Sequence, residues 1–392
     1  MIFEESWRWF GNNDPVSIAD IMQTGVSGIV TALHEVPVGA VWTKDAITKH
    51  LKKIADESNG SLRWNVVESL PVHESIKQGT AERDTYIAQY IESIKNLSQC
   101  GVNCICYNFM PILDWLRSNI HYQLEDGTNA LLYDHIEVVI FDIYILKRQG
   151  AITHYEADVV EIASKRYQEM SADSLATLKN NLLLALPGDT EAFTLQQLKD
   201  GIDAYRNIDK NQLRQNLIYF LKRVVPVAEE YGVGLAIHPD DPPWPVFGLP
   251  RMVSTKKDLD YIFTEVPSIH NGLTFCSGSL GAHPENYLPD MVTNYYERIH
   301  FVHLRSVQRM DRFIFFEANH LEGSTDMHEL ITSFYNYSQE NAYKILPMRP
   351  DHGHVMLDDI DKSFYPGYSL IGRLKGLAEL RGLVMGIERI KT

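Results

Sequence analysis

The sequence repeats one unit: a short apolar segment, a polar or small residue at its end, and then a helical pattern. We predict eight such strands, at 7–10, 28–33, 62–67, 102–107, 232–237, 273–275, 299–302 and 345–348. Nearly continuous apolar strands that alternate with helices are typical of a parallel sheet covered on both faces. Eight units favour closure, so we predict an α/β fold, a (β/α)8 TIM barrel.

Helical patterns separate these strands. We predict helices at 44–57, 83–97, 213–231 and 370–390, with Gly232 as the stop signal of the third. About a hundred residues after Asn108 contain no convincing strand. Residues 131–146 fit either strand or helix, whereas the charged stretch 156–179 favours helix. We therefore predict one catalytic barrel domain over 1–392, with a helical insertion at about 111–212 after strand four, serving as a lid or a subunit contact.

The charge balance excludes several classes of partner. The chain has 36 basic and 51 acidic residues, a formal net charge of −15. Such a surface disfavours binding to nucleic acid and to anionic membranes. A small anionic substrate stays compatible with it, because a few arginines or a metal ion can reverse the charge inside one cleft.

Composition and cysteine usage indicate a cytoplasmic protein. Apolar runs such as 137–141 are far shorter than the roughly 20 residues that span a bilayer. The N-terminal residues are acidic where a secretory signal is basic. Four cysteines are too few for a disulfide framework. Cys104 and Cys106 share one face of a predicted strand, which favours two core thiols.

Four residues able to bind a metal stand at the carboxyl ends of four successive predicted strands. In a barrel these ends meet at one mouth, where active sites are built. Two imidazoles, a thiolate and a carboxylate suit Fe²⁺, Mn²⁺ or Zn²⁺ better than Ca²⁺ or Mg²⁺. Each residue alone also fits a surface histidine or a core cysteine. Their conjunction predicts a metal site made of His238, Cys276, His303 and Asp351.

The neighbouring residues suggest how an acid substrate is held. Arg305 projects in the same direction as His303, and Arg349 directly precedes the Asp351 segment. Guanidinium groups bind carboxylates through two parallel hydrogen bonds, so both arginines are candidate substrate ligands. The alternative is pairing with nearby acids such as Asp358 and Asp359. The Ser-Gly-Ser-Leu-Gly turn after Cys276 is a weak anion-binding signal. No nucleotide-binding glycine motif is present.

Taken together and in order, these motifs resemble the mannonate dehydratase family, the metal-dependent lyases of hexuronate breakdown. The resemblance covers essentially the whole chain. It is carried by the segments 8–11, 31–34, 41–42, 236–243, 275–279, 301–305, 348–354 and 366–368. Arg8 and His34, in the first two segments, are further candidate substrate-binding residues.

The resemblance implies a xylose-isomerase-like barrel that converts D-mannonate to 2-keto-3-deoxy-D-gluconate with loss of water. It implies Fe²⁺ or Mn²⁺ at the four metal-competent positions. It also places catalytic work on His352 and Tyr368, beside Arg305. One group takes the C2 proton and another protonates the leaving C3 hydroxyl, and the sequence does not say which does which. His352 as an orienting residue and Tyr368 as a loop cap remain alternatives.

Two other functions are weighed against this one. A sugar isomerase or epimerase on the same barrel typically binds metal through several carboxylates, and the strand ends offer one clear aspartate. A non-catalytic sugar-acid binder would keep the arginines but has little use for four metal ligands. The partner we expect is a small sugar acid, D-mannonate, with no nucleic acid and no membrane, and the chain itself is expected to form a homo-oligomer, a dimer.

Overall fold

Eight parallel strands close into a barrel, as predicted. The computed structural model describes residues 2–184, 192–340 and 344–391. The barrel strands follow one another in the order β1, β12, β9, β8, β7, β4, β3, β2. Their bounds are β1 Phe3–Arg8, β2 Gly28–Thr31, β3 Arg63–Glu68, β4 Cys104–Tyr107, β7 Gly234–Ile237, β8 Asn271–Cys276, β9 Ile299–Leu304 and β12 Leu346–Pro350.

The first strand begins earlier than predicted, because two acidic residues hide its start. β1 covers Phe3–Arg8 rather than 7–10. The carboxylates of Glu4 and Glu5 pair with arginines of neighbouring elements. Glu4 pairs with Arg63 at 2.7 Å, and Glu5 pairs with Arg381 of the C-terminal helix.

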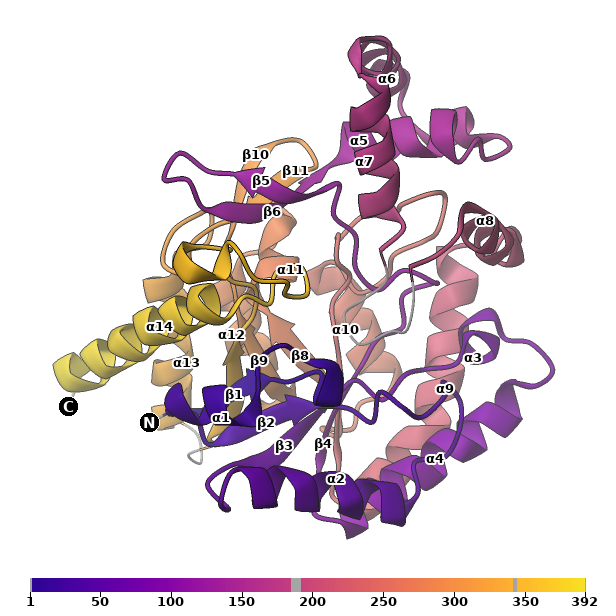
Figure 1. The fold of residues 1–392 in the computed structure, drawn as a ribbon. Helices are drawn as coiled ribbons and strands as arrows, with labels where there is room; N and C mark the ends of the chain where they lie inside the picture. The colour runs from indigo at the N-terminus through magenta and orange to yellow at the C-terminus, as the bar shows by residue number, and fades with distance from the viewer. Residues whose placement is uncertain (1, 185–191, 341–343, 392) are drawn as a thin grey trace.

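Helices surround the barrel (Figure 1) and include the four that we predicted. The third of these ends at Glu230, and Gly232 follows with a φ of +65°, a conformation that favours glycine. The helices are α1 Ile18–Gln23, α2 Lys44–Glu57, α3 Glu74–Gln78, α4 Arg83–Gln99, α5 His135–Ile140, α6 Ala157–Glu169, α7 Ala172–Leu182, α8 Leu195–Ala204, α9 Lys210–Glu230, α10 Lys256–Glu265, α11 Ser277–Ala282, α12 Leu288–Tyr295, α13 Met327–Glu340 and α14 Leu370–Lys391.

The segment after β4 holds helices α5 to α8, but it also holds a β-hairpin that we did not predict. Strands β5 (Asn119–Gln123) and β6 (Asn129–Asp134) join the hairpin β10 (Val307–Asp311) and β11 (Ile314–Glu317). The four form an antiparallel sheet in the order β10, β11, β6, β5. Figure 1 shows this sheet with α5, α6 and α7 on the side of the molecule away from α2 and α4.

The ambiguous stretch 131–146 changes conformation partway along. Its first residues complete β6, α5 follows, and residues 141–145 form a π-helical turn. Asp134 ends the strand and caps the helix, because its Oδ1 accepts a hydrogen bond from the Ile136 N–H at 2.8 Å.

A small cluster of side chains fills the barrel interior. Val30, Val66, Cys106 and Phe301 are buried together, and Cys104 packs against them. Burial raises the pKa of the Cys104 thiol to about 12 and that of Cys106 well above its usual range. These cysteines are packing residues and not reactive thiols, as the strand pattern indicated.

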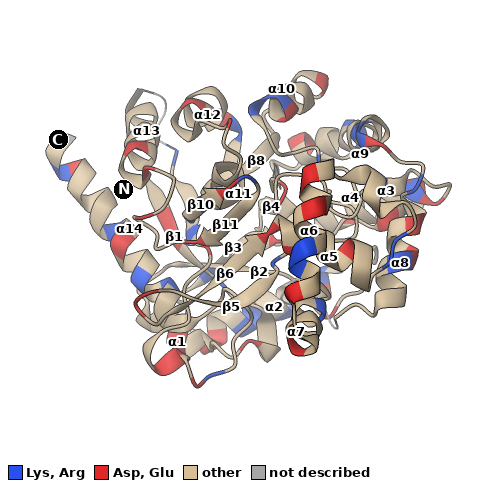
Figure 2. Cartoon of the chain, turned by 90° about the horizontal axis from the view of Figure 1, so that it is seen from above, with Lys and Arg blue, Asp and Glu red and all other residues tan. Residues whose placement is uncertain are grey.

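Charged residues of both signs lie on the outer helices, for example on α6 and α14 (Figure 2). Within the described residues, we find no helix whose length and hydropathy suffice to cross a membrane.

Candidate active site

The carboxyl ends of the barrel strands open into a cavity of about 630 Å³. Its wall contains side chains from the ends of barrel strands and from the loops that follow them. The predicted site residues on this wall are Arg8, His34, His238, Arg305, Arg349, Asp351, His352 and Tyr368.

Three of the four predicted metal ligands converge at this mouth. His238, Cys276 and His303 follow or end the adjacent strands β7, β8 and β9, and Cys276 is the register partner of His303. Each offers one ligand atom, and these atoms lie within 4.8 Å of one another. The strand order therefore assembles residues that are far apart in the sequence.

Hydrogen bonds leave the imidazole nitrogens available for a metal. The Nδ1 of His238 lies 2.7 Å from the Pro239 carbonyl oxygen, so its Nε2 is the free ligand atom. The Nε2 of His303 is buried and makes no hydrogen bond in the described part of the chain, although Oε2 of Glu68 lies 3.6 Å from it. Burial lowers the pKa of His238, which favours the neutral ring that binds metal.

Cys276 is fully buried and begins helix α11. Its Sγ accepts hydrogen bonds from the backbone N–H and the hydroxyl of Ser279, at 3.5 and 3.3 Å. These two donors hold the sulfur in place beside Asp351 at the start of the helix.

Asp351 lies beside this trio. Its Oδ2 is 3.6 Å from the Cys276 Sγ, and its Oδ1 is 2.5 Å from Nη1 of Arg349. Burial alone would raise the pKa of Asp351, but the charges of Arg349 and Arg305 hold it well below its usual range. The carboxylate is therefore ionised next to the two imidazoles and the thiol. This donor set, with its orphaned His303 nitrogen, fits a borderline divalent ion such as Fe²⁺ or Mn²⁺.

Arg349 is occupied by carboxylates of the protein itself. Its Nε and Nη2 donate to the two oxygens of Glu68 at 2.9 and 2.8 Å, while Nη1 donates to Asp351. The acids near it in sequence, Asp358 and Asp359, are not its partners. Because all three guanidinium nitrogens of Arg349 already donate to these carboxylates, the side chain is placed to orient Asp351 and Glu68 rather than to bind a substrate acid group.

Arg305 is the centre of a second ionic network. Its Nη2 donates to Asp241 at 2.8 Å, its Nη1 lies 2.9 Å from Nδ1 of His352, and its Nε lies 3.3 Å from Glu317. A Cβ on Gly278 would come within 1.9 Å of this Nε. The glycine turn after Cys276 therefore admits the arginine side chain. We had interpreted that turn as a weak anion-binding signal.

His352 and Tyr368 meet in the cavity as an edge-to-face pair, with ring centroids 5.2 Å apart. The Nδ1 of His352 lies 2.9 Å from Nη1 of Arg305 and 3.1 Å from Oε1 of Glu317. The tautomer with its proton on Nδ1 donates to Glu317 and leaves Nε2 as the basic nitrogen. Burial raises the pKa of Tyr368 to about 12, so the phenol keeps its proton near neutral pH. Tyr365 lies three residues earlier and is half-buried, with its ring against Phe10 at 5.0 Å.

Arg8 and His34 lie on the side of the mouth formed by β1 and β2. The Nη1 of Arg8 and the Nε2 of His34 are buried without a hydrogen-bond partner among the described residues. Burial, with a further effect of Arg8, lowers the pKa of His34 to about 3, so this ring is neutral. An uncommitted guanidinium N–H on the cavity wall makes Arg8 the better placed of the predicted substrate arginines.

Four charged residues of the site were not singled out in advance: Glu68, Arg117, Asp241 and Glu317. Glu68 ends β3, and Asp241 follows the His238 loop, so their positions at strand ends were the available signal. Arg117 and Glu317 come from the segments around the second sheet. Their partners are distant in sequence, and no local pattern marks them.

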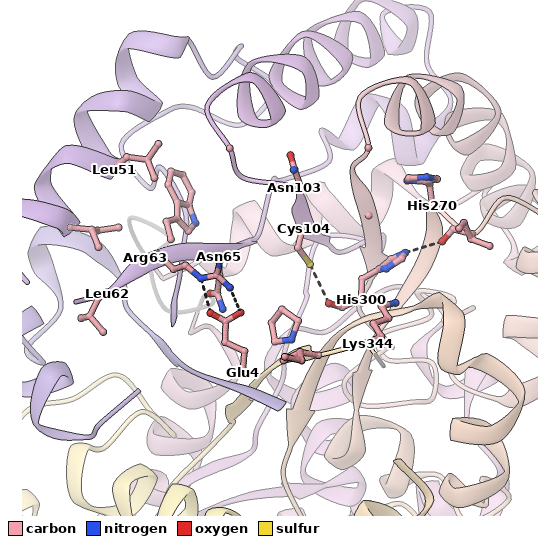
Figure 3. A pocket seen from close by; sticks show the side chains of 18 of the residues that line it. Glu4, Leu51, Leu62, Arg63, Asn65, Asn103, Cys104, His270, His300 and Lys344 are labelled. Atoms are coloured by element: carbon pink, nitrogen blue, oxygen red, sulfur yellow. Dashed lines mark hydrogen bonds and ion pairs between the residues drawn. The ribbon is translucent and has the colours of Figure 1, made fainter. Parts of the chain in front are cut away.

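A second cavity, of about 1080 Å³, lies at the amino ends of the strands (Figure 3). Its polar side chains are largely paired within the protein. Glu4 pairs with Arg63, His300 bonds the Ile269 carbonyl, and Lys344 donates to the Ile299 carbonyl. The chemistry is therefore placed at the opposite mouth, as expected for this fold.

Comparison with known proteins identifies the family. The D-mannonate dehydratase (UxuA) family model matches residues 3–392. The mannonate dehydratases of Marinomonas sp. and Chromohalobacter salexigens are each 45% identical to this chain, and the alignments cover 98–99% of it and 99% of each relative. The crystal structure of mannonate dehydratase from Streptococcus suis serotype 2 matches with a TM-score of 0.77 and 33% identity, over 99% of this chain and 94% of that one.

More distant structures share the fold alone. A xylose isomerase-like TIM barrel protein from Mycobacterium smegmatis matches with a TM-score of 0.53 at 12% identity, over 98% of this chain and 97% of that one. The full-length family match, together with the assembled site, settles the relationship: this chain belongs to the D-mannonate dehydratase family.

Proposed function

We propose that this protein dehydrates D-mannonate to 2-keto-3-deoxy-D-gluconate in hexuronate catabolism, with Fe²⁺ or Mn²⁺ as its metal. Two imidazoles, a thiol and a carboxylate would hold the ion, from His238, Cys276, His303 and Asp351. The observation that carries the proposal is the convergence of this donor set with a His–Tyr pair in one cavity at the barrel mouth.

The reaction removes a proton from C2, next to the carboxylate, and expels the C3 hydroxyl. A divalent ion at this site would supply Lewis-acid stabilisation of the negative charge that develops. The protein adds cationic groups nearby. Arg8 offers an uncommitted N–H for the substrate carboxylate, while Arg305 fixes His352 and neutralises the buried acids around it.

We assign the C2 proton to His352 and the departing hydroxyl to Tyr368. In the tautomer whose Nδ1–H donates to Glu317, Nε2 is the basic nitrogen and accepts the proton. The ionised Glu317, whose pKa is lowered to about 2, stabilises the imidazolium that forms. The Tyr368 phenol, with its pKa near 12, retains a proton to donate as the carbon–oxygen bond breaks.

A panel of sugar acids tests this function against its rivals. Reduced protein with Fe²⁺ or Mn²⁺ is expected to form a 2-keto-3-deoxy acid from D-mannonate, and no ketose or epimer. Interconversion of xylose without loss of water would indicate an isomerase. Metal-independent binding of mannonate without turnover would indicate a sugar-acid binder.

We further propose that the chain works in the cytoplasm as a homodimer. Its C-terminal helix α14 projects from the molecule (Figure 1) and leaves Met385 and Ile390 exposed. Light scattering on the full chain, compared with a Met385→Lys variant, tests whether this helix contributes to association.

A further inference from the structure

The four predicted metal-binding residues occupy only half of the barrel mouth. They lie at β7, β8, β9 and β12, which are consecutive in the barrel. The other half, from β1 to β4, forms the remaining wall of the same cavity. If the proposed function holds, the reacting carbons of a six-carbon acid lie at the metal half, and the rest of its chain needs partners on the opposite half.

Asp114, in the loop after β4, lines this cavity and has one carboxylate oxygen without a hydrogen bond among the described residues. Its Oδ2 accepts a hydrogen bond from Asn108 at 3.2 Å, while its Oδ1 is buried without a hydrogen-bond donor among the described residues. Lys77 lies 4.0 Å away, beyond hydrogen-bonding distance. The side chain lines the cavity and is 24% exposed.

Trp115, the next residue, presents a free donor. Its side chain lines the cavity and is 6% exposed, and its Nε1 is buried with no acceptor in the described structure. The ring stands edge-to-face against His352, with centroids 6.4 Å apart, and the guanidinium carbon of Arg117 lies over it, 5.4 Å from its centroid. Its position beside His352 places the indole next to the site of proton transfer.

A buried donor and a buried acceptor without partners cost free energy unless something else satisfies them. A polyol chain does so, because each hydroxyl both donates and accepts one hydrogen bond. We propose that Asp114 and Trp115 bind the hydroxyl groups at the C5–C6 end of the sugar acid and thereby select six-carbon substrates. This inference rests on the proposed function and adds a specificity subsite to it.

The contacts of both residues also fit a purely structural role, and the experiment has to separate the two. Asp114→Asn and Trp115→Phe are compared with Glu35→Gln. Glu35 lines the same cavity, but its carboxylate is exposed and accepts from Asn12, so it controls for the lost charge. Metal content is measured for every variant.

The substrate pair is D-mannonate and L-erythronate, which keeps the configuration at C2 and C3 but ends at C4. For D-mannonate, we expect kcat/KM to fall on the order of 10-fold or more in Asp114→Asn and Trp115→Phe, the scale of one lost buried hydrogen bond. For L-erythronate, kcat/KM, or its inhibition constant if turnover is too slow, should stay within about 2-fold. Glu35→Gln should preserve the wild-type ratio.

Equal losses for both substrates would overturn the inference, because they indicate that the two residues only support His352 or the loop. A wild-type enzyme that does not distinguish the two acids would overturn it as well. Failure of the wild type to dehydrate D-mannonate at all is a different result, which counts against the proposed function itself.

Discussion

Replacing Arg117 by methionine should destabilise the protein far more than the loss of an ordinary surface ion pair. Arg117 is fully buried, and its Nη1 and Nη2 donate to Asp241 at 2.7 and 3.0 Å. Its Nη2 also donates to Glu317 at 2.7 Å. Methionine fills most of the volume of the arginine side chain, but it leaves the buried carboxylates of Asp241 and Glu317 with Arg305 as their remaining cationic neighbour.

Breaking a buried ion pair from one side costs about 3–5 kcal/mol. Because Arg305 stays next to both carboxylates, we expect the lower end, about 3 kcal/mol. The unfolding entropy of a chain of 392 residues is on the order of 0.8 kcal/mol per kelvin. The melting temperature should therefore fall by about 4 °C in Arg117→Met.

Urea denaturation followed by fluorescence, with scanning calorimetry, measures both quantities. The matched control is Arg312→Met, because Arg312 makes a two-pronged pair with Glu156 but both side chains are more than half exposed. Such pairs contribute about 1 kcal/mol or less. Equal losses in the two variants would refute the argument that the buried network supports the site.

Three further predictions concern pH, proton transfer and substrate binding. The pKa of Glu317 is about 2 in the folded protein and ordinarily 4.5. Its ionised carboxylate therefore stabilises the folded protein above pH 4.5, and this stabilisation is lost as the pH falls toward 2. Glu317→Gln should flatten this part of a plot of unfolding free energy against pH. Tyr368→Phe should lose on the order of 10²-fold in turnover with unchanged metal content, whereas a normal Tyr368→Phe and an inactive Tyr365→Phe would reverse the assignment. Arg8→Lys should raise KM for D-mannonate more than it lowers kcat in steady-state assays, because lysine lacks the planar guanidinium that binds a carboxylate through two N–H groups. Unchanged kinetics would remove Arg8 from substrate binding.

The barrel was predictable because its strands are buried on both sides. Their apolar runs stand out, and each ends in a polar or small residue at the mouth, which is why His238, Cys276 and His303 could be proposed as metal ligands from sequence. β1 was misplaced at its start because Glu4 and Glu5 interrupt the apolar pattern, and their partners, Arg63 of β3 and Arg381 of α14, are distant in sequence.

The second sheet was missed for a different reason. The strand Asn119–Gln123 is largely polar and partly exposed, so it has neither the apolar run of a barrel strand nor a clear alternation. Its stability comes from pairing with β6, which in turn pairs with β11 from almost two hundred residues later. Such pairing leaves no local signal in one sequence.

The same distance explains the ionic partners that sequence reasoning did not supply. Arg349 pairs with Glu68 across 281 positions, and Arg117 pairs with Glu317 across 200. Its place beside Asp351 marked Arg349 as a candidate but suggested substrate contact or local acids, and nothing in the sequence marked Arg117. The structure instead commits Arg349 to holding Asp351 and Glu68 in place.

The central claim is that a metal ion held by Cys276 and its neighbours is required for dehydration of D-mannonate. The direct measurement is metal content and turnover of the same samples, after chelation and after readdition of Fe²⁺ or Mn²⁺ under reducing conditions. We predict that activity disappears with the ion, returns with about one ion per chain, and is absent from a folded Cys276→Ala variant that binds no metal tightly. Full metal occupancy in Cys276→Ala, or turnover by the metal-free wild type, would contradict the account.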